Sequence, residues 1–346
     1  MQLPSLAPFG RKFNSVSPAA TPATLPTSRC NAGSHAALAC TVLALSTLAG
    51  CASLAGDNAV QPVTAAVRGA GVTVFAAGDI ADCRKVRAAD SGAARTAALI
   101  VAGIAVDPAA VVLAMGDTAY PVGLPAEFSD CYAPTWGQFK SRTLPAPGNH
   151  EYYTAGAPGY FGYFGTAAGP DRRGYYSTDV GAWHVVSLNS NLEAPQADAQ
   201  VAWLSADLAA LRRRDPAACI LAFWHHPLYS SGGHGNNLHM RGVWQALMAA
   251  KADLVLAAHD HDYERFAPQD AAANADAATG IRSFVVGNGG ARLTPFTATK
   301  ANSLAQDNAT HGVLKLILRP GDYEWAFLPV DGTAARDVGS ARCHTH

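Results

Sequence analysis

Residues 258–265 read Ala-His-Asp-His-Asp-Tyr-Glu-Arg and directly follow the apolar run Leu-Val-Leu-Ala at 254–257. An apolar run that ends at a polar turn is typical of a buried strand. His259 and His261 are two residues apart, so both side chains point to the same side where this strand ends. The stretch therefore predicts a pair of imidazoles that can meet ligands arriving from other strand ends.

Four other apolar runs also end in residues that can bind a metal ion. An aspartate after a glycine is, when seen alone, often only a helix cap or a turn residue. Open α/β sheets, however, gather their sites at the carboxyl ends of strands, and five such turns together favour one shared site. The four runs and their turns are Val72–Ala77 before Gly78-Asp79, Val111–Met115 before Gly116-Asp117, Thr143–Pro147 before Gly148-Asn149-His150-Glu151, and Ile220–Trp224 before His225-His226-Pro227.

The chemistry of these ligands predicts two metal ions. Oxygen and imidazole ligands without thiolate suit Mn, Fe or Zn, and the ligands are too many for one ion. Two ions about 3.5–4 Å apart, bridged by one carboxylate, form the arrangement that hydrolyses phosphate esters. Asp117 follows a run that we expect to be a central strand, so it is the best candidate for the bridge.

Taken together, the five turns resemble those of the calcineurin-like metallophosphoesterases over about residues 72–330. Tyr120 and the sequence Tyr-Glu-Arg at 263–265 make the chain similar to the purple acid phosphatases. Two departures are Ala258, where that family has glycine, and Asp260, which is expected to be a partner of the neighbouring ligands. The resemblance implies one ion held by Asp79, Asp117, Tyr120 and His261, and a second held by Asp117, Asn149, His225 and His259.

Tyr120 carries information about the metals. A free tyrosine has a pKa near ~10, so binding as tyrosinate at neutral pH requires a strongly polarising ion. We therefore expect Fe(III) beside Tyr120 and a divalent Fe, Mn or Zn ion in the second position. The alternative is that Tyr120 only packs beside Pro121.

We expect a metal-bound hydroxide to attack phosphorus and a histidine to protonate the leaving alkoxide. His150 is the first choice for this acid and His234, in a loop at 230–235 expected to be mobile, is the second; His226 and His239 are weaker candidates. The leading function is hydrolysis of a small phosphate monoester. A phosphodiesterase or nucleotidase using the same centre is the alternative, and a non-catalytic surface binding protein is an alternative of another class.

Strand and helix patterns alternate from Val72 onward and give way to strands near the end of the chain. This order favours a mixed sheet or two stacked sheets with helices outside. The resemblance implies a four-layer α/β/β/α sandwich with two stacked mixed sheets. We expect one domain over 72–335 and a C-terminal tail at 336–346. Helices are expected at 93–104, 126–140, 200–214 and 241–251, a hairpin at 175–178 and 183–188, and late strands at 281–286, 312–318 and 323–329.

Two further segments have a predicted role near the site. The sequence Gly-Asn-Gly-Gly at 287–290 ends a strand and is expected to be a tight turn that supports the site. It lacks the Lys-Ser/Thr of a nucleotide-binding loop. The aromatic stretch 160–164 is either a hydrophobic lid or ordinary packing.

The N-terminal region has the pattern of an export signal. Residues 36–50 (AALACTVLALSTLAG) are uncharged and mostly apolar. They are too few for a membrane span of ~20 residues but fit the hydrophobic part of a signal peptide. Residues 48–51, Leu-Ala-Gly-Cys, resemble the lipobox of bacterial lipoproteins. We therefore expect a signal peptide at 1–50, lipidation of Cys51, a flexible tether at 51–71, and a lipoprotein of the bacterial cell envelope anchored in the membrane. The alternative is a secreted protein in which Cys51 is incidental.

The cysteine content and the net charge give two further predictions, one on disulfides and one on partners. Beyond the leader the chain contains Cys83, Cys131, Cys219 and Cys343, and cysteines in an exported protein are usually paired. Four cysteines allow three pairings, of which we expect Cys83–Cys131 with Cys219–Cys343. The formal net charge is −1 and 15% of residues are charged. No nucleic acid is therefore expected as a partner.

Overall fold

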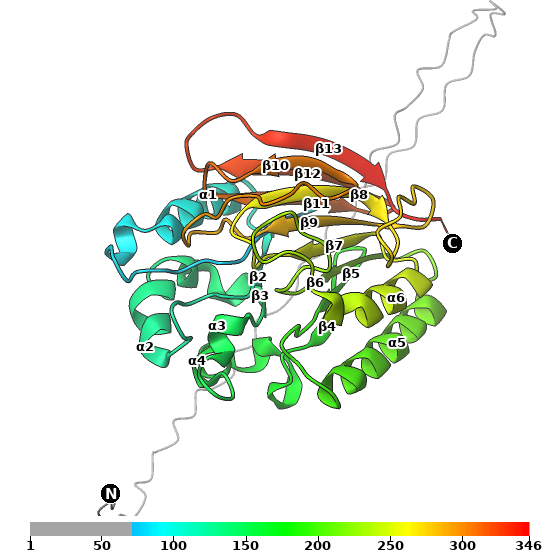
Figure 1. Cartoon of the computed structure of the whole chain (residues 1–346), viewed down its shortest axis with the longest axis horizontal. Coiled ribbons are helices and arrows are strands. Elements are labelled where there is room, and N and C mark those ends of the chain that lie inside the picture. Colours follow the sequence, from blue (N-terminus) through cyan, green and yellow to red (C-terminus); the bar gives the residue numbers. More distant parts are fainter. Residues whose placement is uncertain (1–70, 346) are drawn as a thin grey trace, which may run out of the picture. The chain divides into compact units, whose positions relative to one another are not determined.

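Two mixed β-sheets lie face to face at the centre of residues 71–345, the part of the chain that the structure describes (Figure 1). The structure is a computed structural model. The expected signal peptide, Cys51 and nearly all of the expected tether lie outside the described residues. Helices pack outside the sheets, which agrees with the layered α/β architecture expected from the sequence.

One sheet has six strands and the other has seven. In spatial order the six are β13 (Arg336–Arg342), β12 (Asp322–Pro329), β11 (Gly312–Arg319), β1 (Val72–Ala77), β2 (Val111–Met115) and β3 (Thr143–Ala146). The seven are β10 (Ser303–Asp307), β8 (Tyr263–Gln269), β9 (Ile281–Val286), β7 (Leu254–Ala257), β6 (Cys219–Phe223), β5 (Trp183–Ser187) and β4 (Tyr176–Val180). Strands β1, β2 and β3 are parallel, as are β5, β6, β7 and β9. The carboxyl ends of neighbouring parallel strands therefore meet at one edge of each sheet.

The helices are α1 (Gly92–Val106), α2 (Pro125–Glu127), α3 (Asn149–Tyr152), α4 (Pro158–Phe164), α5 (Gln196–Arg214) and α6 (Arg241–Ala249). Ser91 caps α1, because its hydroxyl accepts a hydrogen bond from the backbone N–H of Ala94 (3.1 Å). Helix α5 ends at Asp215-Pro216, as the sequence predicts, since proline cannot continue the hydrogen-bond ladder.

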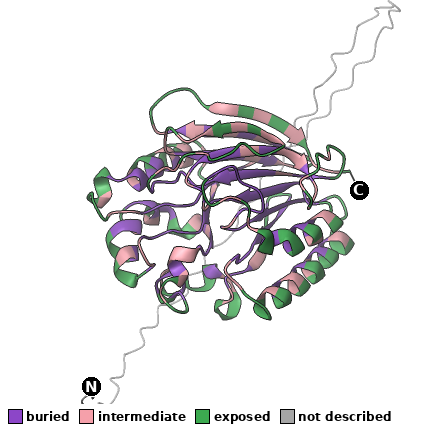
Figure 2. Ribbon diagram, in the orientation of Figure 1, coloured by how far each residue is buried: buried purple, intermediate pink, exposed green. Residues whose placement is uncertain are grey.

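Alternating side chains of the strands build two cores. In β6, Leu221 and Phe223 belong to the core between the sheets, whereas Ile220 and Ala222 belong to a second core with Leu204 of α5. Both faces of the strand are thus covered, which explains why its sequence is continuously apolar. Figure 2 shows the central strands buried and the outward sides of the helices exposed.

The prediction of a single helix at 126–140 is wrong. The segment forms α2, a π-helical turn η2 (Phe128–Tyr132) and a 3-10 segment η3 (Trp136–Arg142). Pro134 lacks a backbone donor and disfavours the helical conformation in the residue before it. Thr135 reinforces the break, because its hydroxyl donates to the carbonyl oxygen of Cys131 (2.7 Å).

The end of the chain also differs from expectation. Residues 336–342, expected within a tail outside the domain, form β13 and pair with β12. The strands β8 and β10 were not foreseen either. β10 pairs with β8, which is distant in sequence, so local pattern alone does not reveal it.

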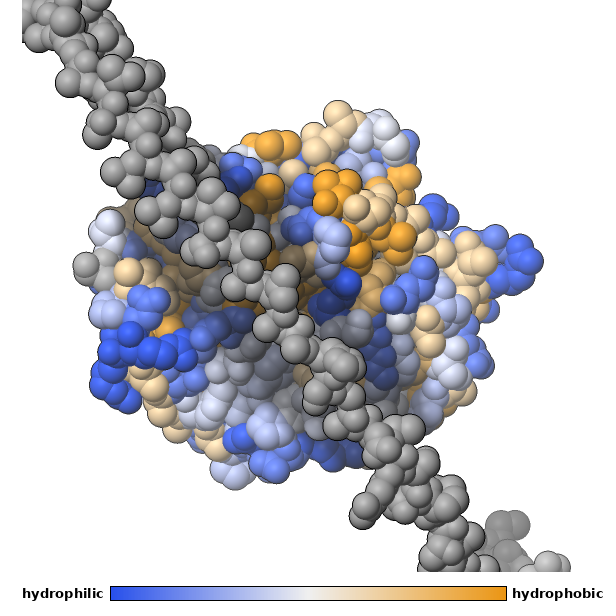
Figure 3. All heavy atoms as spheres, turned by 180° about the vertical axis from the view of Figure 1, so that it is seen from behind, coloured by the Kyte–Doolittle hydropathy of each residue, from blue (hydrophilic) through white to orange (hydrophobic). Residues whose placement is uncertain are grey.

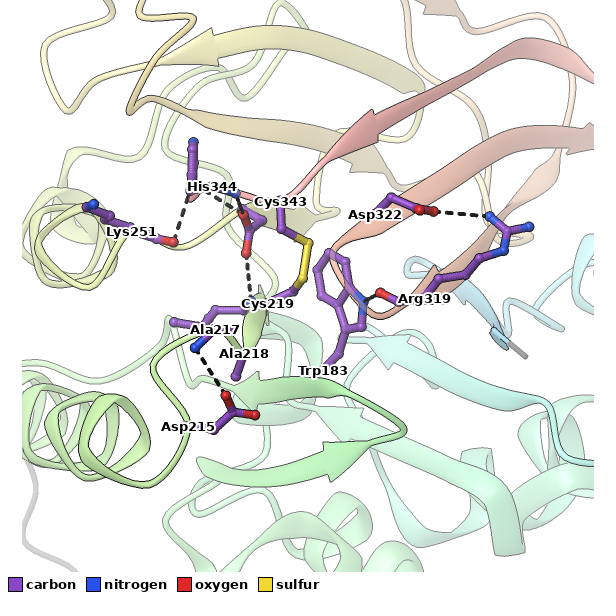
Figure 4. The surroundings of a disulfide bond; sticks show 12 residues. Trp183, Asp215, Ala217, Ala218, Cys219, Lys251, Arg319, Asp322, Cys343 and His344 are labelled. Atoms are coloured by element: carbon purple, nitrogen blue, oxygen red, sulfur yellow. Dashed lines mark hydrogen bonds and ion pairs between the residues drawn. A yellow bond between two sulfur atoms is a disulfide. The ribbon is translucent and has the colours of Figure 1, made fainter. Parts of the chain in front are cut away.

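Two disulfides join distant parts of the fold, Cys83–Cys131 and Cys219–Cys343, and these are the expected pairs. The second links β6 of the seven-stranded sheet to the segment after β13 of the six-stranded sheet (Figure 4). Asp253 strengthens this connection by accepting hydrogen bonds from the backbone N–H groups of Ile220 (2.8 Å) and His344 (2.6 Å). The C-terminal segment is therefore part of the domain.

The surface of the described residues mixes polar and apolar side chains. Seen from behind, hydrophilic residues dominate the lower part of the face and hydrophobic residues gather in the upper part (Figure 3). Leu304 and Val338 are among the exposed large hydrophobic residues. Within residues 71–345, no helix combines the length and the apolar character that crossing a membrane requires.

His184 holds the hairpin β4–β5 against α5 through a charged network. Its Nδ1 lies 2.8 Å from Oδ1 of Asp179 in β4, and its Nε2 lies 2.8 Å from Oδ2 of Asp207 in α5. Burial would lower the pKa of His184, but hydrogen bonds to Asp207 and Asp179 outweigh burial and raise this pKa above its usual value. The folded state therefore binds the proton of His184 more tightly than the unfolded state.

We expect the network to stabilise the fold most at acidic pH. A raised histidine pKa gives stability that is fully present below the unfolded pKa, near ~6.5, and is lost as pH rises through the folded pKa. The free energy of unfolding of His184→Gln should therefore fall below that of the wild type by about 1–3 kcal/mol near pH 5.5, with a smaller gap near pH 9. Urea unfolding at both pH values measures this gap, and an equal gap at both would contradict the prediction.

Candidate metal centre

The five predicted turns meet at one place, although they come from two different sheets. Asp79, Asp117 and Asn149 follow β1, β2 and β3 of the six-stranded sheet, whereas His225 and the pair His259/His261 follow β6 and β7 of the seven-stranded sheet. Asp79, Asp117 and His225 are fully or almost fully buried. Stacking of the sheets therefore brings the two groups of strand ends together.

The backbone of these turns is unusual. Asp79, Asp117 and His259 all have positive φ angles, of 56°, 47° and 72°. Residues other than glycine adopt this left-handed conformation at some energetic cost, and such residues cluster at functional sites. Gly116, at φ 83°, leaves no room for a side chain, since a Cβ there would lie 2.7 Å from Nδ1 of His225.

The departure at Ala258 is accommodated by Gly78. A Cβ on Gly78 would lie 2.5 Å from the Cβ of Ala258. The missing side chain at Gly78 therefore provides the space that the methyl group of Ala258 occupies. The turns after β1 and β7 consequently approach each other closely, and the backbone N–H of His259 donates to Oδ2 of Asp79 (2.8 Å).

Four side chains form the tyrosine-side set, Asp79, Asp117, Tyr120 and His261. The hydroxyl of Tyr120 lies 2.8 Å from Oδ1 of Asp79 and 3.2 Å from Oδ2 of Asp117. Nε2 of His261 lies 3.2 Å from both the Tyr120 hydroxyl and Oδ1 of Asp79. The four ligand atoms thus converge on one point, and Tyr120 takes part in this cluster in addition to its packing.

Four side chains form the asparagine-side set, Asp117, Asn149, His225 and His259. Nε2 of His225 lies 3.1 Å from Oδ1 of Asn149, 3.2 Å from Nδ1 of His259 and 3.3 Å from Oδ2 of Asp117. Oδ2 of Asp117 therefore belongs to both sets. Its other oxygen, Oδ1, accepts a hydrogen bond from the backbone N–H of His150 (2.8 Å).

The ring nitrogens of two histidines are oriented for metal binding. Nδ1 of His225 donates to the carbonyl oxygen of Met115 (2.9 Å), and Nδ1 of His261 donates to that of Arg292 (2.6 Å). Nε2 of each ring then carries the lone pair and faces the ligand sets. A backbone carbonyl that fixes the tautomer in this way is common for metal-binding histidines.

The close contacts between these groups shift their pKa values. Burial would raise the pKa of Asp79, but the imidazoles of His261 and His225 outweigh burial and keep this pKa below its usual value. Burial would lower the pKa values of His225 and His261, but Asp117 and Asp79 respectively outweigh it and raise both to about 9. Burial and the carboxylates of Asp79 and Asp117 raise the pKa of Tyr120 well above 10.

This donor set fits two metal ions. Carboxylate, phenol, amide and imidazole ligands lie within hydrogen-bond distance of one another inside the protein, and no thiolate takes part. Such ligands suit Mn, Fe and Zn. Cations bound there would replace the protons on His225 and His261, so metal binding is coupled to proton release.

Glu151 supports the turn that carries Asp117, a role that the sequence did not reveal. Its buried carboxylate accepts hydrogen bonds from the backbone N–H groups of Asp117 (2.9 Å), Gly148 (2.7 Å) and Thr118 (2.7 Å). It also accepts hydrogen bonds from the Thr118 hydroxyl (2.9 Å) and from the backbone N–H of Ala119 (3.3 Å). One side chain thus fixes the turn after β2 against the start of α3.

Both candidate acids lie at the site. The ring of His150 packs between those of Tyr120 and Tyr153, at 4.3 Å and 4.6 Å between centroids, and its Nε2 lies 3.7 Å from Oδ2 of Asp117. The ring of His234 lies 4.3 Å from that of His259. His239 is exposed in the short helix η6 (Leu238–Met240).

The loop at 230–235, expected to be mobile, is held by two buried carboxylates. Asp260 accepts hydrogen bonds from the backbone N–H of His234 (2.7 Å) and the hydroxyl of Ser230 (2.5 Å). Glu264 accepts hydrogen bonds from both the backbone N–H (2.8 Å) and the hydroxyl (2.6 Å) of Ser231. Asp260 therefore fixes the loop that carries His234. Its carboxylate bonds to this loop and not to the neighbouring ligand side chains, for which it was expected to be a partner.

The two other segments singled out in the sequence have structural roles. In the turn at 287–290, the backbone N–H of Gly289 donates to the carbonyl oxygen of Gly78 (3.0 Å), and a Cβ at Gly287 would lie 2.7 Å from Oδ2 of Asp79. This turn therefore packs directly against a ligand turn. Tyr160, Phe161 and Phe164 are buried in a hydrophobic cluster with Phe128 and Tyr132, which favours ordinary packing over a lid.

Comparison with known proteins agrees with this geometry. The family model described as calcineurin-like phosphoesterase matches residues 72–263. An uncharacterised protein of Mycobacterium tuberculosis is 30% identical over 160 residues, which cover 40% of this chain and 30% of that protein. Purple acid phosphatase 21 of Arabidopsis thaliana is 36% identical over 97 residues, which cover 27% of this chain and 22% of that enzyme. The matching part of this chain thus covers less than a third of the length of either relative.

Solved structures show the same fold. The purple acid phosphatase from yellow lupin (Lupinus luteus) seeds superimposes with a TM-score of 0.63 at 20% identity, covering 79% of this chain and 54% of that one. At this identity the similarity establishes the arrangement of strands and helices.

Proposed function

Because the chain belongs to the calcineurin-like phosphoesterase family, we propose that it hydrolyses phosphate esters at a centre of two metal ions, with small monoesters as its substrates. One observation carries this proposal. Oδ2 of Asp117 lies 3.2 Å from the Tyr120 hydroxyl and 3.3 Å from Nε2 of His225. It can therefore bridge one ion in the tyrosine-side set and one in the asparagine-side set.

Tyr120 supports Fe(III) in the tyrosine-side set and a divalent Fe, Mn or Zn ion in the other. The pKa of Tyr120 is raised by burial and by Asp79, so losing its proton near neutral pH requires a strongly polarising cation. Fe(III) with a divalent ion also leaves more positive charge for a phosphate dianion than two divalent ions would.

The ions, when bound, would supply charge for the phosphoryl oxygens and lower the pKa of water at the site. The chain itself supplies the proton for the leaving alkoxide. His150 is the preferred donor, since its Nδ1 is engaged by the carbonyl oxygen of Pro121 and its Nε2 faces Asp117. His234 is the second candidate because Asp260 holds its loop beside His259.

Hydrolysis of an aryl phosphate monoester, compared with its bis-aryl diester, tests the proposal. The full chain is assayed with its metal content measured in parallel and with a chelated sample as control. We expect preference for the monoester and loss of turnover on chelation. Preference for the diester would replace the phosphatase by a phosphodiesterase. Absence of turnover by a fully metallated protein would overturn both enzymatic functions and favour a surface binding protein.

We also propose that the protein is exported and anchored in a membrane by a lipid on Cys51. The resemblance of Leu-Ala-Gly-Cys at 48–51 to a lipobox supports this. The disulfides Cys83–Cys131 and Cys219–Cys343 are in keeping with an oxidising compartment. Recovery of the wild type in membranes and of Cys51→Ser in the soluble fraction would support the anchor; equal recovery in membranes would contradict it.

A further inference from the structure

We propose that His226 is a fixed hydrogen-bond donor for a phosphoryl oxygen at the metal centre and that Ser190 is the residue that positions it. The inference rests on the proposed function and adds a binding residue to that site. His226 follows the ligand His225 directly, yet its Nδ1 faces the hydroxyl of Ser190, whereas Nδ1 of His225 faces the carbonyl oxygen of Met115.

His226 lies beside the asparagine-side set. Its ring centroid is 4.3 Å from that of His259 and 4.9 Å from that of His225. A ring nitrogen of His226 lies within 4.8 Å of one nitrogen of each of these two histidines. His225 is fully buried, whereas His226 is partly exposed. Part of His226 is therefore accessible to a molecule that binds at the centre.

Ser190, which lies just after β5, determines which nitrogen of His226 carries the proton. The serine oxygen accepts a hydrogen bond from the backbone N–H of His226 (3.0 Å) and lies 2.8 Å from Nδ1 of the same residue. The Ser190 hydroxyl is buried, and Nδ1 is the acceptor within its reach among the described residues. The hydroxyl therefore donates to Nδ1, and the neutral ring carries its hydrogen on Nε2.

This tautomer is the reverse of that in the ligands His225 and His261. Those rings donate Nδ1–H to backbone carbonyl oxygens and direct an Nε2 lone pair at the ion sets. In His226 the lone pair of Nδ1 is used by Ser190, so Nε2 presents an N–H group. An N–H group cannot bind a cation, but it can donate to an anionic oxygen. The ligand His259 offers its Nδ1 to the cluster, 3.2 Å from Nε2 of His225, whereas Nδ1 of His226 is already used by Ser190. The hydrogen bond to Ser190 thus separates His226 from the ligands and gives it a binding role.

The surroundings keep this donor in place. The indole nitrogen of Trp224 donates to the carbonyl oxygen of His226 (2.8 Å), and Trp224 is fully buried. Together with the two contacts to Ser190, this fixes both the backbone and the ring. A preorganised donor of this kind needs no rearrangement when a phosphoryl oxygen arrives.

Binding of inorganic phosphate to the metal-loaded full chain, measured by calorimetry, tests the inference without requiring turnover. We expect His226→Ala to weaken phosphate binding by roughly tenfold to a hundredfold, the range for a hydrogen bond to a charged group. His226→Gln should recover part of this loss, because its amide N–H reaches about as far as Nε2. Ser190→Ala should weaken binding less than His226→Ala, and Ser190→Thr, which keeps the hydroxyl, should approach the wild type.

Metal content separates a donor from a ligand. Each variant should retain both ions; loss of an ion from His226→Ala would make His226 a ligand and overturn the inference. Wild-type affinity in His226→Ala, equal loss in His226→Ala and His226→Gln, or no phosphate binding by the wild type would overturn it as well. If the wild type binds phosphate but hydrolyses no ester, and His226→Ala still weakens binding, the proposed function fails while the inference stands.

Discussion

Replacing Asp117 with Asn is expected to abolish phosphoester turnover and to release metal from both positions. Oδ2 of Asp117 is the atom common to the two ligand sets, so its loss weakens both at once. An amide also removes a negative charge that stabilises the cations. Mutation of a residue that only hydrogen-bonds to a metal ligand typically lowers metal affinity or activity by about 10–100-fold. The loss for this shared ligand should therefore exceed about 100-fold.

Metal content and monoester hydrolysis of Asp117→Asn measure this effect. Asp130→Asn is the matched control, because Asp130 is an exposed aspartate in the turn η2 whose oxygen accepts the Ser129 hydroxyl. The control should retain both ions and full turnover. An Asp117→Asn protein that kept two ions and turnover near the wild-type rate would show that Asp117 is not the bridge.

Replacing Glu151 with Ala is expected to lower the free energy of unfolding by about 3–5 kcal/mol, because several buried donors lose their acceptor and each costs about 1–3 kcal/mol. The change leaves the backbone N–H groups of Asp117, Thr118 and Gly148 without their acceptor inside the protein. Glu151→Gln should lose less stability than Glu151→Ala, since one side-chain oxygen remains as an acceptor. Its amide N–H group, however, would face backbone donors.

Urea unfolding of the chelated proteins measures this effect separately from metal binding. Glu193→Ala is the control, because Glu193 is exposed just before α5 and such surface changes usually stay within about 0.5 kcal/mol. A Glu151→Ala protein that unfolds with the wild-type free energy would mean that water replaces the carboxylate and that Glu151 does not hold the turn.

The ligand turns could be predicted from the sequence because each is a local event. A buried strand such as β1 or β2 gives a continuous apolar run, and the residues after it, Gly78-Asp79 or Gly116-Asp117, stand next to that run in the chain. Which sheet each strand joins was not readable in the same way. The site in fact combines two sheets, because pairing depends on partners as distant as Leu318 for Val72.

The parts that could not be predicted depend on contacts between distant residues. The loop at 230–235 has the glycine and serine content of a mobile segment, but Asp260 and Glu264 hold it. The tautomer of His226 depends on Ser190, 36 residues earlier. The break in the helix expected at 126–140 is different, because Pro134 is visible in the sequence and gave sufficient reason to end the helix there.

We propose that two metal ions are held by seven side chains, Asp79, Asp117, Tyr120, Asn149, His225, His259 and His261. Elemental analysis of the full chain, saturated with iron and a divalent metal and then freed of loosely bound ions, tests it most directly. The account predicts two ions per chain, at least one of them iron. One ion or none at saturation would contradict it, since Asp117 would then have no second site to bridge.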